Sequence, residues 1–63
     1  MNQEEMKAHL ETKSTHELFD IIRSTKMSLN TMKALYVIEE GDEAVKRHDD
    51  VIACANRIIR NRQ

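Results

Sequence analysis

The chain contains no proline and only one glycine, Gly41, among its 63 residues. Proline and glycine most often interrupt helices and form the tight turns between strands, so their near absence favours long helices over hairpins. A chain of this length forms one small domain, residues 1–63. Its core alone gives only marginal stability, so such domains usually need a disulfide, a metal or oligomerisation. The sequence therefore predicts an all-α fold in a single domain.

Capping residues mark the expected helix starts. Asn2 with Glu5, and Ser14 with Glu17, have the spacing of a capping box, in which the first side chain accepts a hydrogen bond from the first turn. A third start follows the glycine, where Asp42 can cap a helix. The helices predicted from these signals cover residues 3–12, 15–40 and 43–61.

The segment ALYVI, residues 34–38, is short and apolar, and alone it would also fit a buried strand. An apolar stripe with steps of three and four residues runs through it, which favours a helix. Gly41 is then expected to have a positive φ, because the helix must stop and reverse there. The stripes are Leu18, Ile22, Thr25, Leu29, Met32 and Tyr36 in the long helix, and Val45, His48, Ile52, Ala55 and Ile59 in the last.

The relative lengths of the helices predict how they pack. The last helix folds back on the long one as a helical hairpin but is too short to cover it, at about 1.5 Å per residue. The short N-terminal helix, with Met6 and Leu10, is expected to cover the remainder, so that the first and third helices lie end to end along the second.

Some apolar residues of the long helix exceed what two partner helices can bury. We therefore predict a helical-bundle homo-oligomer, since a small domain also gains stability from association. The alternative is a monomer with an apolar surface. The predicted interface residues are Phe19, Leu35, Val37 and Ile38.

Residues that carry catalysis or bind metals do not cluster in this sequence. His48 has no His or Cys three or four residues away, so a hydrogen bond to a neighbour is its expected role. Cys54, the only cysteine, is expected to pack at the edge of the apolar stripe. No glycine-rich phosphate loop, zinc motif or nucleophile motif is present. We predict no enzymatic activity, no cofactor and no metal.

Charge and hydropathy limit the compartment and the partners. The net charge of -1 gives no general attraction to nucleic acid, and sequence-specific DNA binding is not expected. No apolar run is long enough for a membrane span, and the initial MNQEEMKAHLE is too polar for a signal peptide. Together with the single thiol, these features predict a cytoplasmic protein without membrane contact.

Two pairs of basic residues, three positions apart, would each share one face of a helix. They are Arg23 and Lys26 in the long helix, and Arg57 and Arg60 in the last. Such pairs can hold a phosphate group through two hydrogen bonds. The alternatives are a solvated face for the first pair and attraction to the negative end of the helix dipole for the second. As a ligand site, these four side chains would bind an anion.

Two motifs in these helices are similar to those of a known family. FDIIR, residues 19–23, resembles the aromatic–acid–x–aliphatic–Arg start of the long helix in helical-hairpin phage anti-defence proteins. DDVIACANRII, residues 49–59, resembles their last helix. The resemblance covers residues 19–62. Cys54 stands where that family usually has tryptophan, and Ala8-His9 stands where an aromatic–His pair is expected.

The resemblance implies a small phage-like inhibitor that sequesters a cyclic oligonucleotide or related nucleotide signal of CBASS or Thoeris immunity. A second hypothesis, from the residues, is a helical oligomeric adaptor that binds a host protein through its apolar flank or acidic turn. A third is an RNA-binding four-helix bundle, although the contact residues of such plasmid regulators are not matched. Convergence of the two basic pairs would favour the first hypothesis.

Overall fold

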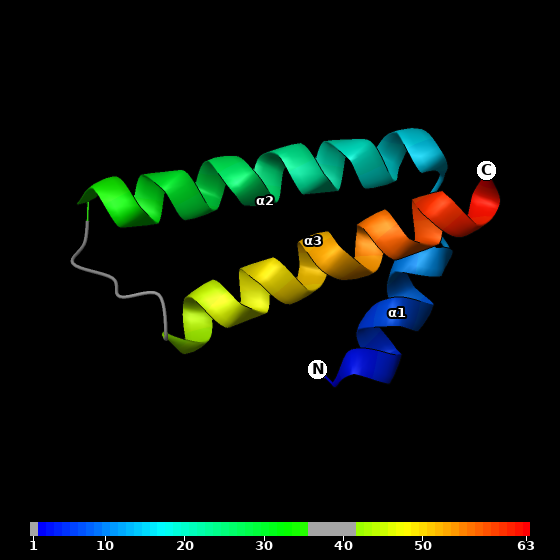
Figure 1. Cartoon of the computed structure of the whole chain (residues 1–63), viewed down its shortest axis with the longest axis horizontal. Coiled ribbons are helices and arrows are strands. Elements are labelled where there is room, and N and C mark those ends of the chain that lie inside the picture. Colours follow the sequence, from blue (N-terminus) through cyan, green and yellow to red (C-terminus); the bar gives the residue numbers. More distant parts are fainter. Residues whose placement is uncertain (1, 36–41) are drawn as a thin grey trace.

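The computed structural model describes residues 2–35 and 42–63, which form three helices (Figure 1). All of the described secondary structure is helical, which confirms the predicted all-α class for this part of the chain. The end of the long helix, the segment ALYVI beyond Leu35 and the positive φ expected of Gly41 lie outside the described residues. The helices are α1 (Gln3–Glu11), α2 (Thr15–Leu35) and α3 (Glu43–Arg62).

The helices begin at the predicted caps. Asn2 Oδ1 accepts a hydrogen bond of 2.8 Å from the Glu5 amide. Ser14 and Glu17 cap α2 reciprocally: the Glu17 amide donates to Ser14 Oγ and the Ser14 amide donates to Glu17 Oε1, both at 3.1 Å. Asp42 is the N-cap of α3 and has an extended backbone there. The capping-box spacing therefore locates the starts of α1 and α2, and Asp42, predicted from its place after Gly41, locates that of α3.

The capping box of α2 makes this helix sensitive to acid. The hydrogen bond from the Ser14 amide, and then that from the Ser14 hydroxyl, lowers the pKa of Glu17. A carboxyl with a lowered folded-state pKa stabilises the fold above its unfolded-state pKa, and this stabilisation is lost as the pH falls through the folded-state pKa.

We therefore expect the unfolding midpoint to fall as the pH decreases from about 5 to about 3, where glutamate protonates. Glu17→Gln should remove that part of the pH dependence, because glutamine can still accept the Ser14 hydrogen bond but does not titrate in this range. Thermal unfolding followed by circular dichroism across this pH range measures both effects. Identical pH profiles for the two chains would contradict the assignment.

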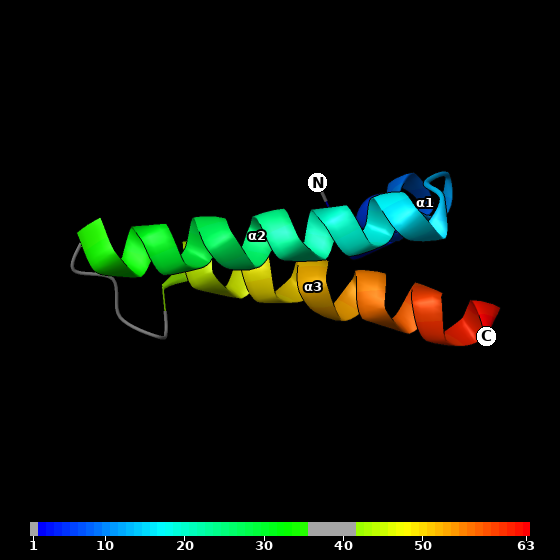
Figure 2. The same cartoon turned by 90° about the horizontal axis from the view of Figure 1, so that it is seen from above.

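The core lies where α2 and α3 run side by side and antiparallel (Figures 1 and 2). Both predicted stripes face it, with Thr25, Met32, His48 and Ile52 half-buried at its margins and Tyr36 outside the described residues. His48 has the neighbouring partner that was expected, since its Nδ1–H donates to the Ala44 carbonyl at 2.7 Å. The buried side chains are Leu10, Leu18, Ile22, Leu29, Val45, Ala55, Ile58 and Ile59.

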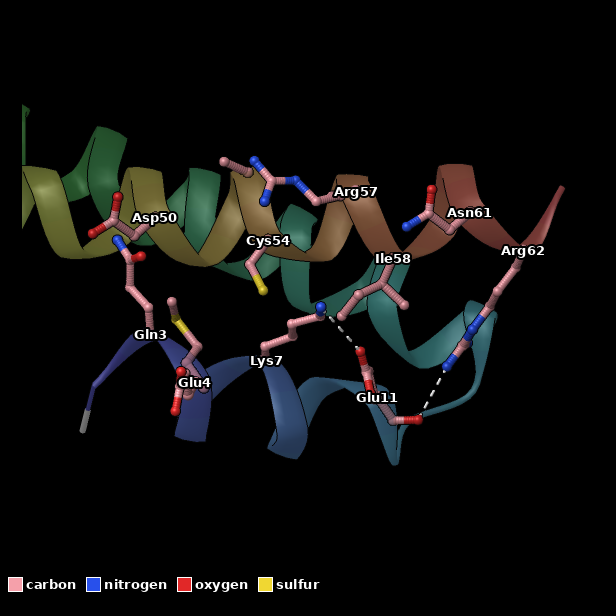
Figure 3. Close-up of a pocket in the computed structure, with 12 residues that line it drawn as sticks. Gln3, Glu4, Lys7, Glu11, Asp50, Cys54, Arg57, Ile58, Asn61 and Arg62 are labelled. Carbon is pink, nitrogen blue, oxygen red and sulfur yellow. Dashed lines mark hydrogen bonds and ion pairs between the residues drawn. The ribbon is translucent and has the colours of Figure 1, made fainter.

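The position of α1 differs from the prediction. α3 contacts both α2 and α1, whereas α1 has little contact with α2, so the first and third helices do not lie end to end along the second. In the view of Figure 1, α3 is drawn between α2 and α1, and Figure 2 shows that α1 and α2 lie on the same side of α3. The physical reason is that α3 is apolar on two faces. Ala55 and Ile59 pack with α2 residues in the core, while Cys54 and Ile58 point toward α1 (Figure 3).

Candidate anion-binding site

A groove of about 590 Å³ lies between α1 and α3 (Figure 3). Its volume falls within the usual range for small-molecule sites, about 300–1,000 Å³. Its lining is mixed. Met6, Cys54 and Ile58 contribute apolar surface, and the remaining lining is mostly polar or charged. The polar and charged lining residues are Gln3, Glu4, Lys7, Glu11, Asp50, Arg57, Asn61 and Arg62.

The charges of the groove are balanced. Three cations, Lys7, Arg57 and Arg62, face three carboxylates, Glu4, Glu11 and Asp50. Lys7 Nζ is 3.9 Å from Glu11 Oε1, and Arg62 donates hydrogen bonds to other protein groups. Only Arg57 of the three is without an ion pair or a hydrogen bond among the residues that the structure describes. The groove therefore has no excess of positive charge with which to attract an anion.

Arg62 joins the junction of α1 and α2 to the end of α3. Its Nη2 donates to the Glu11 carbonyl at 3.1 Å, as Figure 3 shows, and its Nη1 donates to Thr15 Oγ1 at 3.2 Å. The first acceptor belongs to the last turn of α1, where carbonyls lack a partner within the helix. The second lies in the first turn of α2. One guanidinium thus contacts all three helices.

Arg62→Gln is expected to destabilise the fold by about 1–2 kcal/mol, because two charge-assisted hydrogen bonds at an exposed site are lost. Amide hydrogen exchange in α1 should accelerate more than in α2, since α1 has few other tertiary contacts. Arg60→Gln is the matched control, because it removes the same charge near the same helix end. Equal midpoints for the two variants in urea denaturation would show that the Arg62 contacts contribute nothing.

The seam between α2 and α3 has two edges. The seam itself is formed by Leu18 and Ile22 of α2 with Ala55 and Ile59 of α3, which belong to one buried cluster. A residue directly before or after such a contact position is turned by about 100° toward one edge or the other. Because the helices are antiparallel, the residues that follow contact positions on either helix lie on the same edge, and those that precede them lie on the opposite edge.

One of these edges is covered by α1. Cys54 and Ile58 each precede a contact position of α3, and both line the groove beneath α1. Ile21 precedes a contact position of α2 and is likewise half-buried against the core. The side of the seam toward α1 is therefore apolar and largely withdrawn from solvent.

Within residues 2–35 and 42–63, no helix covers the opposite edge, which we call the seam edge. Phe19 and Arg23 follow contact positions of α2, Asn56 and Arg60 follow those of α3, and all four are exposed. Phe19, the aromatic residue of this edge, is 50% exposed. The seam edge comprises Phe19, Arg23, Lys26, Asn30 and Lys33 of α2 with Lys46, Asp49, Asn56 and Arg60 of α3.

The seam edge carries an excess of positive charge. Its five cations, Arg23, Lys26, Lys33, Lys46 and Arg60, outnumber the single carboxylate of Asp49. None of these cations takes part in the ion pairs found among the described residues, which are Lys7–Glu11, His16–Asp20 and Arg47–Glu43. Their charge can therefore be neutralised by solvent ions or by an anionic ligand.

The predicted ligand residues thus lie on two surfaces. Arg23, Lys26 and Arg60 share the seam edge, whereas Arg57 lines the groove beneath α1. Lys33 was not among the predicted ligand residues, although its spacing of seven from Lys26 places both on one face of a helix. Phe19, a predicted oligomer-interface residue, also lies on the seam edge.

No family model matches this chain, and no curated protein or solved structure is significantly similar to it. Within residues 2–35 and 42–63, no group of three or more His, Cys, Asp or Glu side chains is arranged to hold a metal ion. None of the helices in these ranges is long and apolar enough to cross a membrane. The seam edge and the groove are thus the candidate sites, and only the seam edge has unbalanced charge.

The predicted oligomer interface is described only in part. Phe19 and Leu35 are 50% and 70% exposed, and Met27, which lies between them on α2, is 63% exposed. Val37 and Ile38 lie outside the described residues. The single chain therefore leaves large apolar side chains of α2 in contact with solvent.

Proposed function

We propose that this protein is a non-enzymatic binding protein that holds a nucleotide signal at its seam edge. The observation that supports this most directly is that Arg23 and Arg60, from two different helices, share an uncovered edge with the half-exposed ring of Phe19. A nucleotide combines an anionic phosphate with an aromatic base. Guanidinium groups bind the phosphate, and an exposed aromatic ring stacks on the base.

The groove beneath α1 is the weaker candidate for the same ligand. It has a volume of about 590 Å³, but its cations and carboxylates are equal in number. A phosphate bound there beside Glu4, Glu11 or Asp50 would experience repulsion as well as attraction. At the seam edge, the corresponding repulsion comes from Asp49 alone.

The biological role proposed for this binding is inhibition by sequestration. The motifs of residues 19–23 and 49–59 resemble those of phage anti-defence proteins that capture nucleotide immune signals. A protein of this kind would bind its ligand without cleaving it and would act in the cytoplasm, where such signals are produced. Stoichiometric binding on rigid helices is sufficient for this role, because preorganised cations lose little entropy when the ligand arrives.

We propose that the active form is a homo-oligomer. Association would cover Met27 and Leu35, which are 63% and 70% exposed in the single chain, while the ring of Phe19 would lie at the margin of the interface and could still stack on a base. It would also supply the additional stability that a domain of this size usually needs. A ligand bound beside Phe19 would then lie near a subunit boundary, and the ratio of ligands to subunits would be a whole-number ratio.

The second candidate function is a helical adaptor that binds a host protein. The same exposed apolar side chains favour it, because clusters of such residues often form protein interfaces. In that case the partner would cover α2, and the cations of the seam edge would only border the contact.

Isothermal titration calorimetry with cyclic dinucleotides, cyclic trinucleotides and ADP-ribose derivatives tests the proposal. Arg23→Ala and Arg60→Ala should each weaken binding by roughly 10- to 150-fold, the equivalent of one charge-assisted hydrogen bond of about 1.5–3 kcal/mol. Arg57→Ala is the matched control, because it removes the same charge from the groove and should leave the affinity unchanged. Heating the complex should release the ligand intact, as judged by chromatography.

The other outcomes of this experiment are equally informative. Loss of binding in Arg57→Ala alone would move the site to the groove. Binding that survives the loss of both seam-edge arginines would preserve the function and refute the site. Absence of heat with every nucleotide, together with specific capture of a host protein, would favour the adaptor.

A further inference from the structure

The cations of α2 continue well beyond the pair that sequence spacing singled out. Residues 21–35 contain Arg23, Lys26 and Lys33 but no Asp or Glu. Their spacings of three and seven residues keep all three on one face of the helix. Lys33 lies 14 positions after Phe19, which corresponds to about 21 Å along the axis. The positive charge of the seam edge is therefore a line rather than a single point.

A linear charge distribution selects for a linear ligand. A compact cyclic dinucleotide that stacks on Phe19 could contact Arg23, Arg60 and Lys26, but Lys33 would lie two helical turns farther on. A stacked single strand advances by about 3.4 Å per nucleotide, so about six stacked nucleotides, or fewer extended ones, span the line from Phe19 to Lys33.

We infer that the seam edge binds a linear single-stranded oligonucleotide of about four to six nucleotides. A base at one end stacks on Phe19, and successive phosphates contact Arg23, Lys26 and Lys33 along α2. This inference rests on the proposed function, because it assumes that the seam edge binds nucleotides. It identifies the ligand as a linear oligonucleotide rather than a mononucleotide or a compact ring.

Asp49 provides an independent marker of the path of the strand. It follows the half-buried His48 on α3 and lies 11 positions before Arg60, so it borders the part of the seam edge away from Phe19. A strand that reaches Lys33 passes this carboxylate, whereas a ligand confined to the Phe19 end does not. Removing the charge of Asp49 should therefore strengthen the binding of long ligands only.

The experiment compares linear oligoadenylates of two, four and six nucleotides with cyclic diadenylate, by fluorescence anisotropy at low salt. The hexanucleotide should bind the wild-type chain at least about tenfold more tightly than the dinucleotide, through added stacking and phosphate contacts. Lys33→Ala should remove most of that gain and leave dinucleotide binding unchanged. Asp49→Asn should raise hexanucleotide affinity by roughly two- to fivefold, an effect that added salt suppresses. Arg57→Ala is the control for loss of a cation outside the edge.

Two results would overturn the inference and are distinguishable from failure of the proposed function. Equal affinity for cyclic diadenylate and the hexanucleotide, with no effect of Lys33→Ala, would show a compact ligand. Sensitivity of that binding to Arg23→Ala would then leave the proposed function intact. Absence of binding by every nucleotide would overturn both.

Discussion

Replacing Leu18 by alanine is expected to unfold a large fraction of the chain. Leu18 is fully buried, at 0% exposure, within the cluster that α1, α2 and α3 share. Removing a buried leucine side chain costs about 2–5 kcal/mol, because contacts are lost and a cavity remains. A domain of 63 residues has only about 3–9 kcal/mol of stability in total, at roughly 0.05–0.15 kcal/mol per residue.

Urea denaturation followed by circular dichroism measures this effect. Thr31→Ala is the control, because it shortens an exposed side chain of the same helix outside both the core and the proposed interface. The control should change the midpoint little, since an exposed side chain contributes little packing. A Leu18→Ala chain as stable as the control would mean that α1, α2 and α3 do not share this core.

Leu35→Asp is expected to dissociate the proposed oligomer into chains of 7.4 kDa. Leu35 is 70% exposed in the single chain, so the substitution disturbs no core contact there. In a subunit interface, however, the introduced carboxylate would be buried without a partner, at a cost of several kcal/mol. The thermal midpoint should fall as well, because association stabilises the folded subunit.

Sedimentation velocity at micromolar concentration decides this prediction. Thr31→Asp is the control, because it adds the same charge at an exposed position of α2 without removing an apolar side chain. It should leave the sedimentation coefficient unchanged. A wild-type chain that sediments as a stable 7.4 kDa monomer across the micromolar range would refute the assembly.

The local features of the fold could be predicted from the sequence. The Ser14–Glu17 capping box depends on residues three positions apart, so its spacing is sufficient to locate the start of α2. The stripes of α2 and α3 were equally visible, because helical periodicity determines which residues share a face. Leu18, Ile22, Ala55 and Ile59 are buried as that periodicity predicted.

The choice of helix partners could not be predicted in the same way. Ile58 lies one position before the stripe residue Ile59, and in the structure it faces α1. Periodicity identifies apolar faces but does not say which helix covers each one. The same limit applies to the candidate site. Arg57 and Arg60 lie on different surfaces because α1 borders the side of α3 that carries Arg57, and periodicity does not predict which side α1 borders.

The central position of α3 also affects how the chain folds as it is made. Synthesis proceeds from the N-terminus, so α1 and α2 leave the ribosome before the helix that both of them contact. Because α1 has little contact with α2, these two segments can bury little apolar surface against each other before α3 is synthesised. Their apolar faces stay accessible to chaperones and proteases until α3 emerges. Folding of this domain is therefore expected to follow the synthesis of α3.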